Sequence, residues 1–501
     1  MNCTSLVSKL ANRKTQNCLI YLKPIHISDF KMAKGKGAAG SLEKLDSDIT
    51  NLLQYVCQES TTGKISEIKH INESLAAIQK QHKNRTNNKN NDDYEVPEIS
   101  VAQRLEYLQN LFKSYSSSVQ NIDKIELIEQ FGGYGLKKVA DANSENKSKT
   151  DLRVPKKLML LANLDDESDF SEFLKKDKMT SGMQNVKLAL RLLFERMQSD
   201  KSVHHDYINS LPRKYNTPLY WSNSDFEELA KTGECGGEEY LAGYNLLRAC
   251  TRQYCYFLNV FATIPNLRKF YSSLSWDAYR WAVSTVQTRA NLIEDELLGF
   301  IPIIDLANTS VSSEIGIDRL FDNEETTHAC LDLTRFNTGD DMLISYGKME
   351  RSCINMLIHN GLVLVEKLDF TLTVPAFKKI GDKKMAYMRK IGGANFDENA
   401  VLSPQVRVQM DQDNSKFTYA LIQMQNFLSL MLDKNEDKEE YDYEDDTLQE
   451  SAKKFLTIRL LVLNKQISGA NVENFENPCL KPYIEAKKEV LMRLIKCCKD
   501  L

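Results

Sequence analysis

The sequence predicts an α+β fold in which a β-rich core is interrupted by a long helical block. Three observations support this prediction. Apolar runs typical of strands occur at residues 125–163 and again at residues 298–346. Between them, residues of about 165–280 carry apolar side chains at helical spacing, and helical, charged segments continue past residue 365. Because strands return after the helices, we expect one β-rich domain with an insertion, followed by a mostly helical region.

Length and charge limit the classes of protein to consider. The chain has 501 residues, which is too long for one compact core, so we expect two or three folding units. Its apolar content of 42% and charged content of 27% are ordinary for a globular protein. The net charge of −4 gives no support for a nucleic-acid partner, and the absence of an apolar run of membrane-spanning length predicts no membrane segment.

The cysteines and the N-terminal residues bear on location. Eleven cysteines are scattered without a CxxC pair and without histidines at metal-ligand spacing, so we predict reduced thiols, no metal site, and a cytoplasmic or nuclear protein. The first 28 residues contain no Asp or Glu, and a lack of acidic residues is also a feature of mitochondrial transit peptides. We nevertheless expect residues 1–40 to be disordered. Met1 and Met32 are both candidate chain starts.

The predicted elements before the insertion are two helical regions and a hairpin. Residues 41–81 have the spacing of one or two helices, and the Asn-rich stretch His82–Asp93 predicts a linker, so we bound this N-terminal region at 41–96. A further helix is expected around Arg104. Residues 125–139 then read as strand, glycine turn and strand, because three glycines fall within four residues there. Residues 153–163 predict another strand that bends at Pro155.

The predicted elements after the insertion begin with a helix that ends at Arg289-Ala-Asn291. Strands are expected at Leu298–Asp305, His328–Asp332 and Asp341–Tyr346. The segment FTLTV predicts one more extended piece before the chain becomes helical. The acidic run Asn435–Asp446 is typical of a solvated loop.

Polar residues follow two of the predicted strands at the point where each ends. Asp305 and Asn308 come after the apolar run at residues 300–304, and Tyr346 ends the run at residues 343–345. Each feature alone is explained by an Asx turn or by a tyrosine packed at a hairpin rim. Two strands that stop at polar residues also suggest a shared pocket, and the set in chain order is more specific than any part.

The motifs GYG, TRAN, IPIIDLAN, ISYG and IHNG, in this order, resemble those of SET-domain protein methyltransferases. The subgroup is the one that contains the Rubisco lysine methyltransferases and the animal actin-histidine methyltransferases, and LPRKYNTPLYW, TRQYCYF and VPKKLM resemble the latter. The resemblance covers about Ser41 to Val365. It implies a SET core at 97–365 with a knot-like strand crossing, the insertion at about 165–280, and a helical substrate-binding domain at 366–501.

The resemblance also implies S-adenosylmethionine as cofactor and actin as protein substrate. Tyr346 would lie beside the transferred methyl group, and Asn291 would orient a target imidazole. Arg252 and Ile304 would lie on the substrate side. The residues that match the family's cofactor contacts are Arg104, Gly132, Gly133, Tyr134, Arg289, Asp305, Leu306, Ala307, Asn308, Thr309, Asn360, Gly361 and Leu362.

The sequence departs from the family pattern at three positions. Thr309 stands where a histidine is usual, Ile304 where an aromatic residue is common, and Gly132 where an acid is frequent. A histidine acceptor, with a reference pKa near 6.5, is already mostly neutral at pH 7, whereas a lysine must first lose a proton. A site without an evident strong base therefore suits histidine without excluding lysine. Two alternatives stay open: a lysine methyltransferase acting on a non-histone protein, and a catalytically weak relative that binds actin or another protein.

Overall fold

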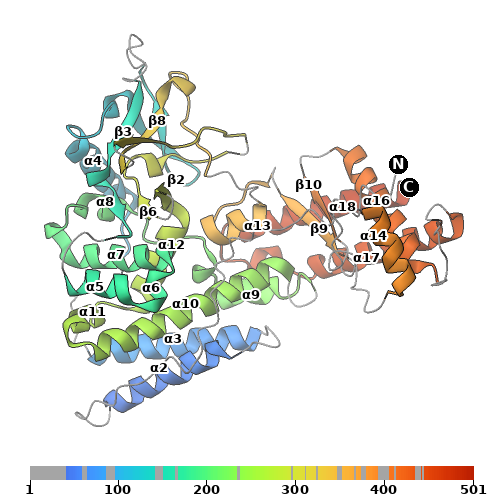
Figure 1. Cartoon of the computed structure of the whole chain (residues 1–501), viewed down its shortest axis with the longest axis horizontal. Helices are drawn as coiled ribbons and strands as arrows, with labels where there is room; N and C mark the ends of the chain where they lie inside the picture. Colours follow the sequence, from blue (N-terminus) through green and yellow to red (C-terminus); the bar gives the residue numbers. More distant parts are fainter. Residues whose placement is uncertain are drawn as a thin grey trace.

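The structure, a computed structural model, consists of two lobes. Figure 1 shows a larger lobe, with the N-terminal helices, the sheets and the central helices, and a smaller helical lobe formed by the C-terminal segment. Among the described residues, no helix is both long and apolar enough to span a membrane. The described residues are 41–58, 65–85, 96–140, 150–163, 168–233, 237–294, 297–310, 312–322, 325–346, 352–365, 368–373, 380–392, 405–410, 413–434, 442 and 445–501.

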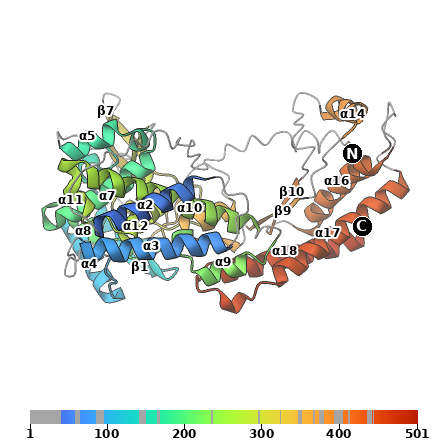
Figure 2. The ribbon, with the colours of Figure 1, turned by 90° about the horizontal axis from the view of Figure 1, so that it is seen from below.

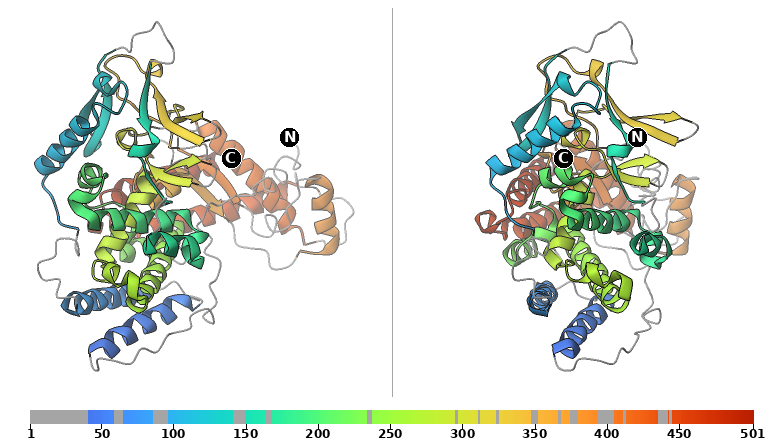
Figure 3. Two further views of the ribbon diagram at one scale, coloured as in Figure 1. Left: turned by 60° about the vertical axis from the view of Figure 1, so that its left-hand side comes forward. Right: turned by 90° about the vertical axis from the view of Figure 1, so that its left-hand side faces the viewer.

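The two predicted N-terminal helices are α2 (Ser41–Cys57) and α3 (Ile65–Arg85). They lie along α10 (Gly237–Thr263), at the end of the larger lobe away from the strands (Figures 1 and 3). The predicted linker is wrong at its start, because α3 continues through His82. This side chain is fully buried and packs edge-on against Tyr271, with ring centroids 4.4 Å apart. The rest of the predicted linker lies outside the described residues, apart from the end of α3.

The glycine hairpin follows a capped helix. α4 (Val101–Tyr115) begins with a capping box between Ser100 and Gln103, which satisfies backbone N–H groups at its first turn. The hairpin pairs β1 (Ile125–Gln130) with β2 (Gly133–Lys138), so the predicted strand–turn–strand is confirmed. Phe131 and Gly132 form the turn with φ angles of 52° and 73°, the left-handed geometry that two-residue hairpin loops require.

Two three-stranded antiparallel sheets complete the β part of the larger lobe. The predicted strand at 153–163 is divided by a 3₁₀ turn at Lys156–Leu158, directly after Pro155. In both sheets, a strand that precedes the helical insertion pairs with a strand that follows it, as predicted. One sheet has the order β3 (Asp151–Pro155), β8 (Glu325–Asp332), β7 (Asp318–Asp322); the other has the order β4 (Leu160–Leu161), β6 (Leu297–Phe300), β5 (Asn291–Glu294).

Two of the predicted strands are shorter than expected. The strand predicted to reach Asp305 ends at Phe300, because Pro302 has no N–H for a ladder and Ile303 turns the chain with φ 72° and ψ −59°. Residues 304–306 then form a 3₁₀ turn. The strand predicted at 341–346 is reduced to isolated bridges.

Those bridges nevertheless bring three distant segments together. Met342 N donates to Leu136 O of β2 at 2.7 Å, and Ile344 N donates to Asn308 O at 2.8 Å. Asn308 and Leu343 form a parallel bridge. The segment that ends at Tyr346 therefore lies between the glycine hairpin and the turn that follows β6.

The helical insertion packs around an aromatic core. Phe170 stacks on Phe194 with ring centroids 4.8 Å apart, and Tyr254, Tyr279 and Trp281 are fully buried. This burial explains why the region is apolar at helical spacing. Its helices are α5 (Asp169–Lys176), α6 (Lys178–Ser181), α7 (Gln184–Gln198), α8 (His205–Ser210), α9 (Asn223–Leu229), α10, α11 (Arg268–Tyr271) and α12 (Trp276–Arg289).

The smaller lobe is mostly helical, as predicted, with one addition. The predicted extended piece FTLTV is β9 (Asp369–Thr373), and it pairs with β10 (Gln405–Gln409), which the sequence reasoning missed. Figure 2 shows the long C-terminal helices side by side and reaching back towards the larger lobe. The helices after the sheets are α13 (Cys353–Asn355), α14 (Asp382–Gly392), α16 (Asn414–Leu432), α17 (Asp446–Ser468) and α18 (Leu480–Asp500).

A buried ion pair joins the two lobes. Lys487 of α18 donates to both carboxylate oxygens of Glu239 in α10, at 3.0 and 2.9 Å, and the Glu239 side chain is 0% exposed. Nearby, the Asp225 carboxylate of α9 accepts from the backbone N–H groups of Glu476 and Asn477 at 2.8 and 3.1 Å. These contacts fix the start of α18 against the insertion.

Replacing Lys487 with alanine is expected to lower the free energy of unfolding by about 3–5 kcal/mol, because Glu239 would be left as a buried, unpaired charge. Urea denaturation of both proteins measures this difference. The control is Lys481→Ala in the same helix, which removes an exposed ion pair with Glu473 and should leave the midpoint unchanged. Equal midpoints for Lys487→Ala and Lys481→Ala would contradict the structural role of the buried pair.

Candidate active site

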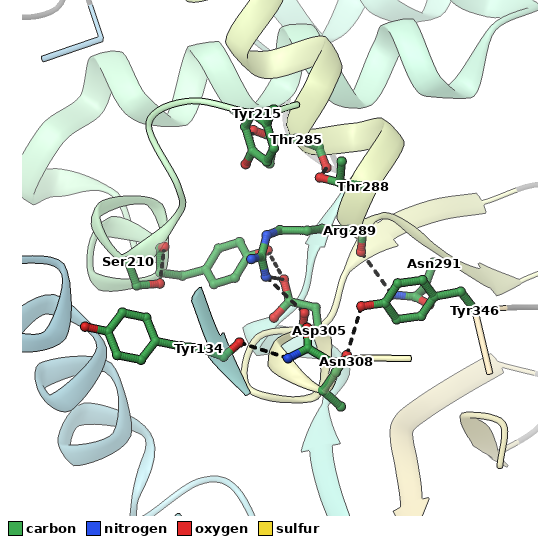
Figure 4. Close-up of polar contacts among 12 residues, drawn as sticks. Tyr134, Ser210, Tyr215, Thr285, Thr288, Arg289, Asn291, Asp305, Asn308 and Tyr346 are labelled. Atoms are coloured by element: carbon green, nitrogen blue, oxygen red, sulfur yellow. Dashed lines mark hydrogen bonds and ion pairs between the residues drawn. The ribbon is translucent and has the colours of Figure 1, made fainter. Parts of the chain in front are cut away.

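The predicted site residues converge where α12 ends. Arg289 is the last residue of α12, Asn291 begins β5, and the 3₁₀ turn with Asp305 follows β6. Figure 4 shows Arg289, Asp305, Asn308, Asn291 and Tyr346 gathered around this helix end. Ile303, with its positive φ, sits directly before the turn, and such strained non-glycine residues cluster at functional sites.

Arg289 and Asp305 form the buried centre of this cluster. Arg289 Nη1 donates to the backbone O of Asp305 at 2.9 Å and lies 3.6 Å from its Oδ2. The two side chains are only 15% and 1% exposed. Burial raises the pKa of Asp305, and the neighbouring Arg289 opposes that rise. Asp305 Oδ2 also accepts a hydrogen bond from Tyr207 at 2.6 Å.

Asn308 is held by the hairpin. Its Nδ2 donates to Gln130 Oε1 at 2.7 Å and to Tyr134 O at 3.3 Å, so both amide hydrogens have acceptors. Gln130 in turn donates to Asp341 at 2.8 Å and thereby links the hairpin to the crossing segment. The sequence reasoning did not identify Gln130; its position next to the glycine turn was the available signal. Gly135 leaves the space in which the two amides meet.

A Gly135→Ala variant should disturb this arrangement. A Cβ at Gly135 would lie 2.4 Å from Gln130 Oε1 and 2.8 Å from Asn308 Nδ2. We expect a loss of about 1–3 kcal/mol in unfolding free energy, as for other overpacked sites. Asn308 cannot easily move away, because its backbone O accepts from Ile344 N and its Nδ2 donates to Tyr134 O. Thermal denaturation measures the loss. Gly316→Ala is the control, since nothing lies within 4 Å of a Cβ there. The expectation fails if Gly135→Ala melts like Gly316→Ala.

Tyr346 and Asn291 flank the turn from the other side. The Tyr346 hydroxyl donates to Ala307 O at 3.1 Å, and Asn291 Nδ2 donates to Arg289 O at 3.0 Å. Figure 4 shows both side chains on the same side of Arg289 and Asp305. The Asn291 hydrogen bond fixes its amide so that the amide oxygen is the atom left to accept a hydrogen bond from another group.

Arg104 approaches the cluster from α4. Its guanidinium lies over the Tyr134 ring, 5.2 Å from the centroid, and its Nε donates to Ser210 O at 3.4 Å. Burial, together with the neighbouring cations Arg289 and Arg213, lowers the pKa of Arg104 to about 10. Within the described part of the chain, no carboxylate pairs with Arg104. Arg104 therefore adds a positive charge to the cluster that no carboxylate of the described residues pairs with.

Beside α12 lie three further predicted site residues, Asn360, Gly361 and Leu362. Residues 356–360 form a π-helical turn, a geometry frequent at functional sites, and Gly361 ends it with φ 60°. A Cβ at Gly361 would lie 2.9 Å from the carbonyl carbon of Asn216, so the two chain segments are in close contact. Tyr215, next to Asn216, hydrogen-bonds Thr285 of α12 at 2.9 Å (Figure 4).

The structure does not bring every predicted residue to an open face of the site. Arg252 lies in α10 near Cys57 of α2, which is on the other side of the insertion from the sheets. Ile304 is 0% exposed and packs in the core. Its burial argues against the predicted contact of its side chain with a substrate. Thr309 is also buried. Among the described residues, no cluster of histidine, cysteine and acidic side chains suits a metal ion.

The fold is that of a SET-domain methyltransferase with a helical insertion and a helical C-terminal lobe. Rubisco LSMT bound to AdoMet aligns with a TM-score of 0.53, 17% identity, and coverage of 79% of this chain and 92% of that one. The SET domain of LSMT bound to lysine and AdoHcy aligns with a TM-score of 0.51, 16% identity, and coverage of 80% and 92%. At this identity, the likeness shows the fold alone.

Curated relatives narrow the resemblance. The chain is 32% identical over 243 residues to the actin-histidine N-methyltransferase of Xenopus tropicalis, covering 47% of this chain and 39% of that protein. It is 33% identical over 236 residues to the Danio rerio enzyme and 31% identical over the same length to the human enzyme. The matched region spans well under half the length of these relatives. No family model matches the chain. The predicted resemblance to SET-domain methyltransferases, and to the actin-histidine enzymes among them, is confirmed.

Proposed function

We propose that the protein is an S-adenosylmethionine-dependent protein N-methyltransferase that methylates a histidine side chain of actin. The convergence of Arg289, Asp305, Asn308 and Tyr346 around one helix end carries this proposal. A methyl transfer from a sulfonium is an in-line displacement, so an enzyme contributes mostly alignment of donor and acceptor. The bound cofactor would supply the methyl group; the protein would hold donor and acceptor in line.

The charge of the site suits this cofactor. S-adenosylmethionine carries a carboxylate, and Arg104 is a half-buried cation next to Arg289 without a carboxylate partner in the described chain. Asp305 Oδ1 is buried and has no hydrogen-bond partner there. We propose that the cofactor contacts are made by Arg104, Gly132, Gly133, Tyr134, Arg289, Asp305, Leu306, Ala307, Asn308, Thr309, Asn360, Gly361 and Leu362, in part through backbone groups.

A histidine acceptor is supported by Asn291. Its Nδ2 is committed to Arg289 O, so its amide oxygen is free to accept the Nδ1–H of an imidazole. The lone pair on Nε2 would then face the methyl group beside Tyr346. An imidazole with its reference pKa near 6.5 is mostly neutral at pH 7, so no strong base is needed to deprotonate it.

Actin is the proposed partner because the similar curated proteins are named for it. We place the protein in the cytoplasm, with the nucleus as the alternative. The smaller helical lobe remains a proposed substrate-binding domain, whereas the positions of Arg252 and Ile304 do not support the substrate contacts predicted for them.

Mass spectrometry of actin after incubation with the protein and S-adenosylmethionine tests the function. We expect one added methyl group on a histidine. Methylation of a lysine instead would favour the lysine methyltransferase alternative. Unmodified actin, with retained binding to the protein, would favour a catalytically weak actin-binding relative.

Asn291→Ala should lower the rate of histidine methylation by roughly 100-fold, a typical effect of removing one oriented polar group from a transition state. Equilibrium binding of S-adenosylmethionine should stay nearly unchanged, because Asn291 faces the acceptor. Equal losses of cofactor binding and methylation would refute the orienting role.

A further inference from the structure

Tyr207 makes the shortest side-chain contact to the buried carboxylate at the centre of the site. Its hydroxyl donates to Asp305 Oδ2 at 2.6 Å, whereas the Arg289 Nη1 lies 3.6 Å from the same oxygen, beyond hydrogen-bond distance. Asp305 Oδ1 is buried without a partner among the described residues. Among the described residues, Tyr207 of the helical insertion therefore makes the close side-chain hydrogen bond to this carboxylate, and Arg289 adds its positive charge from 3.6 Å.

The geometry of Tyr207 is fixed by its own packing. Tyr207 is 1% exposed, and its ring lies against Phe300 of β6 with centroids 6.0 Å apart and planes at 45°. Its helix, α8, also offers Ser210 O to Arg104 at 3.4 Å. One short helix therefore contacts both Arg104 on α4 and Asp305 in the turn after β6.

The turn that carries Asp305 requires such support. Ile303 is held at φ 72°, a conformation that a β-branched residue adopts only when its surroundings impose it. The next residues present Ala307 O to Tyr346 and Asn308 O to Ile344. A shift of Asp305 would therefore move the groups on which Tyr346 and the crossing segment depend.

We propose that Tyr207 is a positioning residue of the methyl-donor site, which acts through Asp305 and Arg289 to hold the strained turn in its binding geometry. This inference rests on the proposed function and deepens it. The insertion then has a role in the site itself, in addition to any role in substrate binding. Loss of the hydroxyl leaves the ring and its packing in place, so the hydrogen bond can be tested by itself.

The test compares S-adenosylmethionine binding by calorimetry in the full chain and in Tyr207→Phe. A hydrogen bond to a charged group is lost, so we expect the dissociation constant to rise roughly tenfold or more. The matched control is Tyr279→Phe. Tyr279 lies in α12, the helix that carries Arg289, but remote from Asp305. It is equally buried, and its hydroxyl donates to Gln253 Oε1 at 2.9 Å. Tyr279→Phe should lose stability similarly and retain cofactor affinity.

A double-mutant cycle identifies the route of the effect. In an Asp305→Asn background, Tyr207→Phe should change the affinity by no more than about twofold, because its partner charge is gone. Equal effects in both backgrounds would overturn the inference, as would unchanged affinity of Tyr207→Phe in the wild-type background. If Tyr207→Phe fails to fold, Asp305→Asn alone must weaken the affinity or the inference is wrong. A wild-type chain that binds no S-adenosylmethionine overturns the proposed function, and this inference with it.

Discussion

An Arg289→Ala variant is expected to lose about 3–5 kcal/mol of unfolding free energy and all measurable binding of S-adenosylmethionine. The physical reason is the burial of Asp305, whose side chain is 1% exposed. Without the guanidinium, its carboxylate keeps the Tyr207 hydrogen bond but has no cation beside it. The same substitution removes the donor that holds the Asp305 backbone carbonyl at 2.9 Å. Urea denaturation and calorimetry measure the two losses.

Two further variants separate the effect of leaving the Asp305 charge unpaired from the effect of removing an arginine side chain. Arg280→Ala, in the same helix, removes a partly exposed ion pair with Asp277 and should cost no more than about 1 kcal/mol. Combining Arg289→Ala with Asp305→Asn should recover part of the stability, because the unpaired charge is removed. A double variant that is as unstable as the sum of both single variants would contradict the account of Arg289 as the partner of a buried charge.

A Tyr346→Phe variant is expected to lower the turnover number roughly 100-fold with little change in cofactor affinity. The hydroxyl donates to Ala307 O at 3.1 Å and so fixes the tyrosine against the turn at the proposed acceptor position. Steady-state kinetics with actin and a separate binding measurement distinguish the two quantities. The ring is retained, so the shape of the site changes little.

Tyr256→Phe serves as the control for the loss of a tyrosine hydroxyl. Tyr256 is a partly buried residue of α10 that hydrogen-bonds Asp177, away from the site. Its replacement should leave the turnover number unchanged. A Tyr346→Phe enzyme with the wild-type rate would show that this tyrosine only shapes the site.

The sequence predicted the order of the elements because that order depends on local patterns. The glycine turn at Gly132, the end of α12 at Arg289 and the helical insertion all follow from spacing and turn residues. Pro302 and Ile303 show where such patterns stop being sufficient. An apolar run gives no sign that one β-branched residue takes a positive φ, since the surrounding structure imposes that geometry.

The cluster of site residues was anticipated from motifs, but its supporting contacts were not. Tyr207 and Gln130 reach Asp305 and Asn308 from segments 98 and 178 residues away in sequence. No local period connects them, so only the tertiary structure reveals these hydrogen bonds. The pairing of β9 with β10 was missed for the same reason, because a strand partner more than thirty residues away leaves no local signal.

Calorimetric titration of the full chain with S-adenosylmethionine tests the central claim most directly. The claim is that the hairpin, the end of α12, the turn at Asp305 and the segment ending at Tyr346 form one site for a methyl donor. We predict binding at one site per chain that is lost in Arg289→Ala and unaffected in Arg280→Ala. A folded wild-type chain that binds no S-adenosylmethionine, or equal binding by both variants, would contradict it.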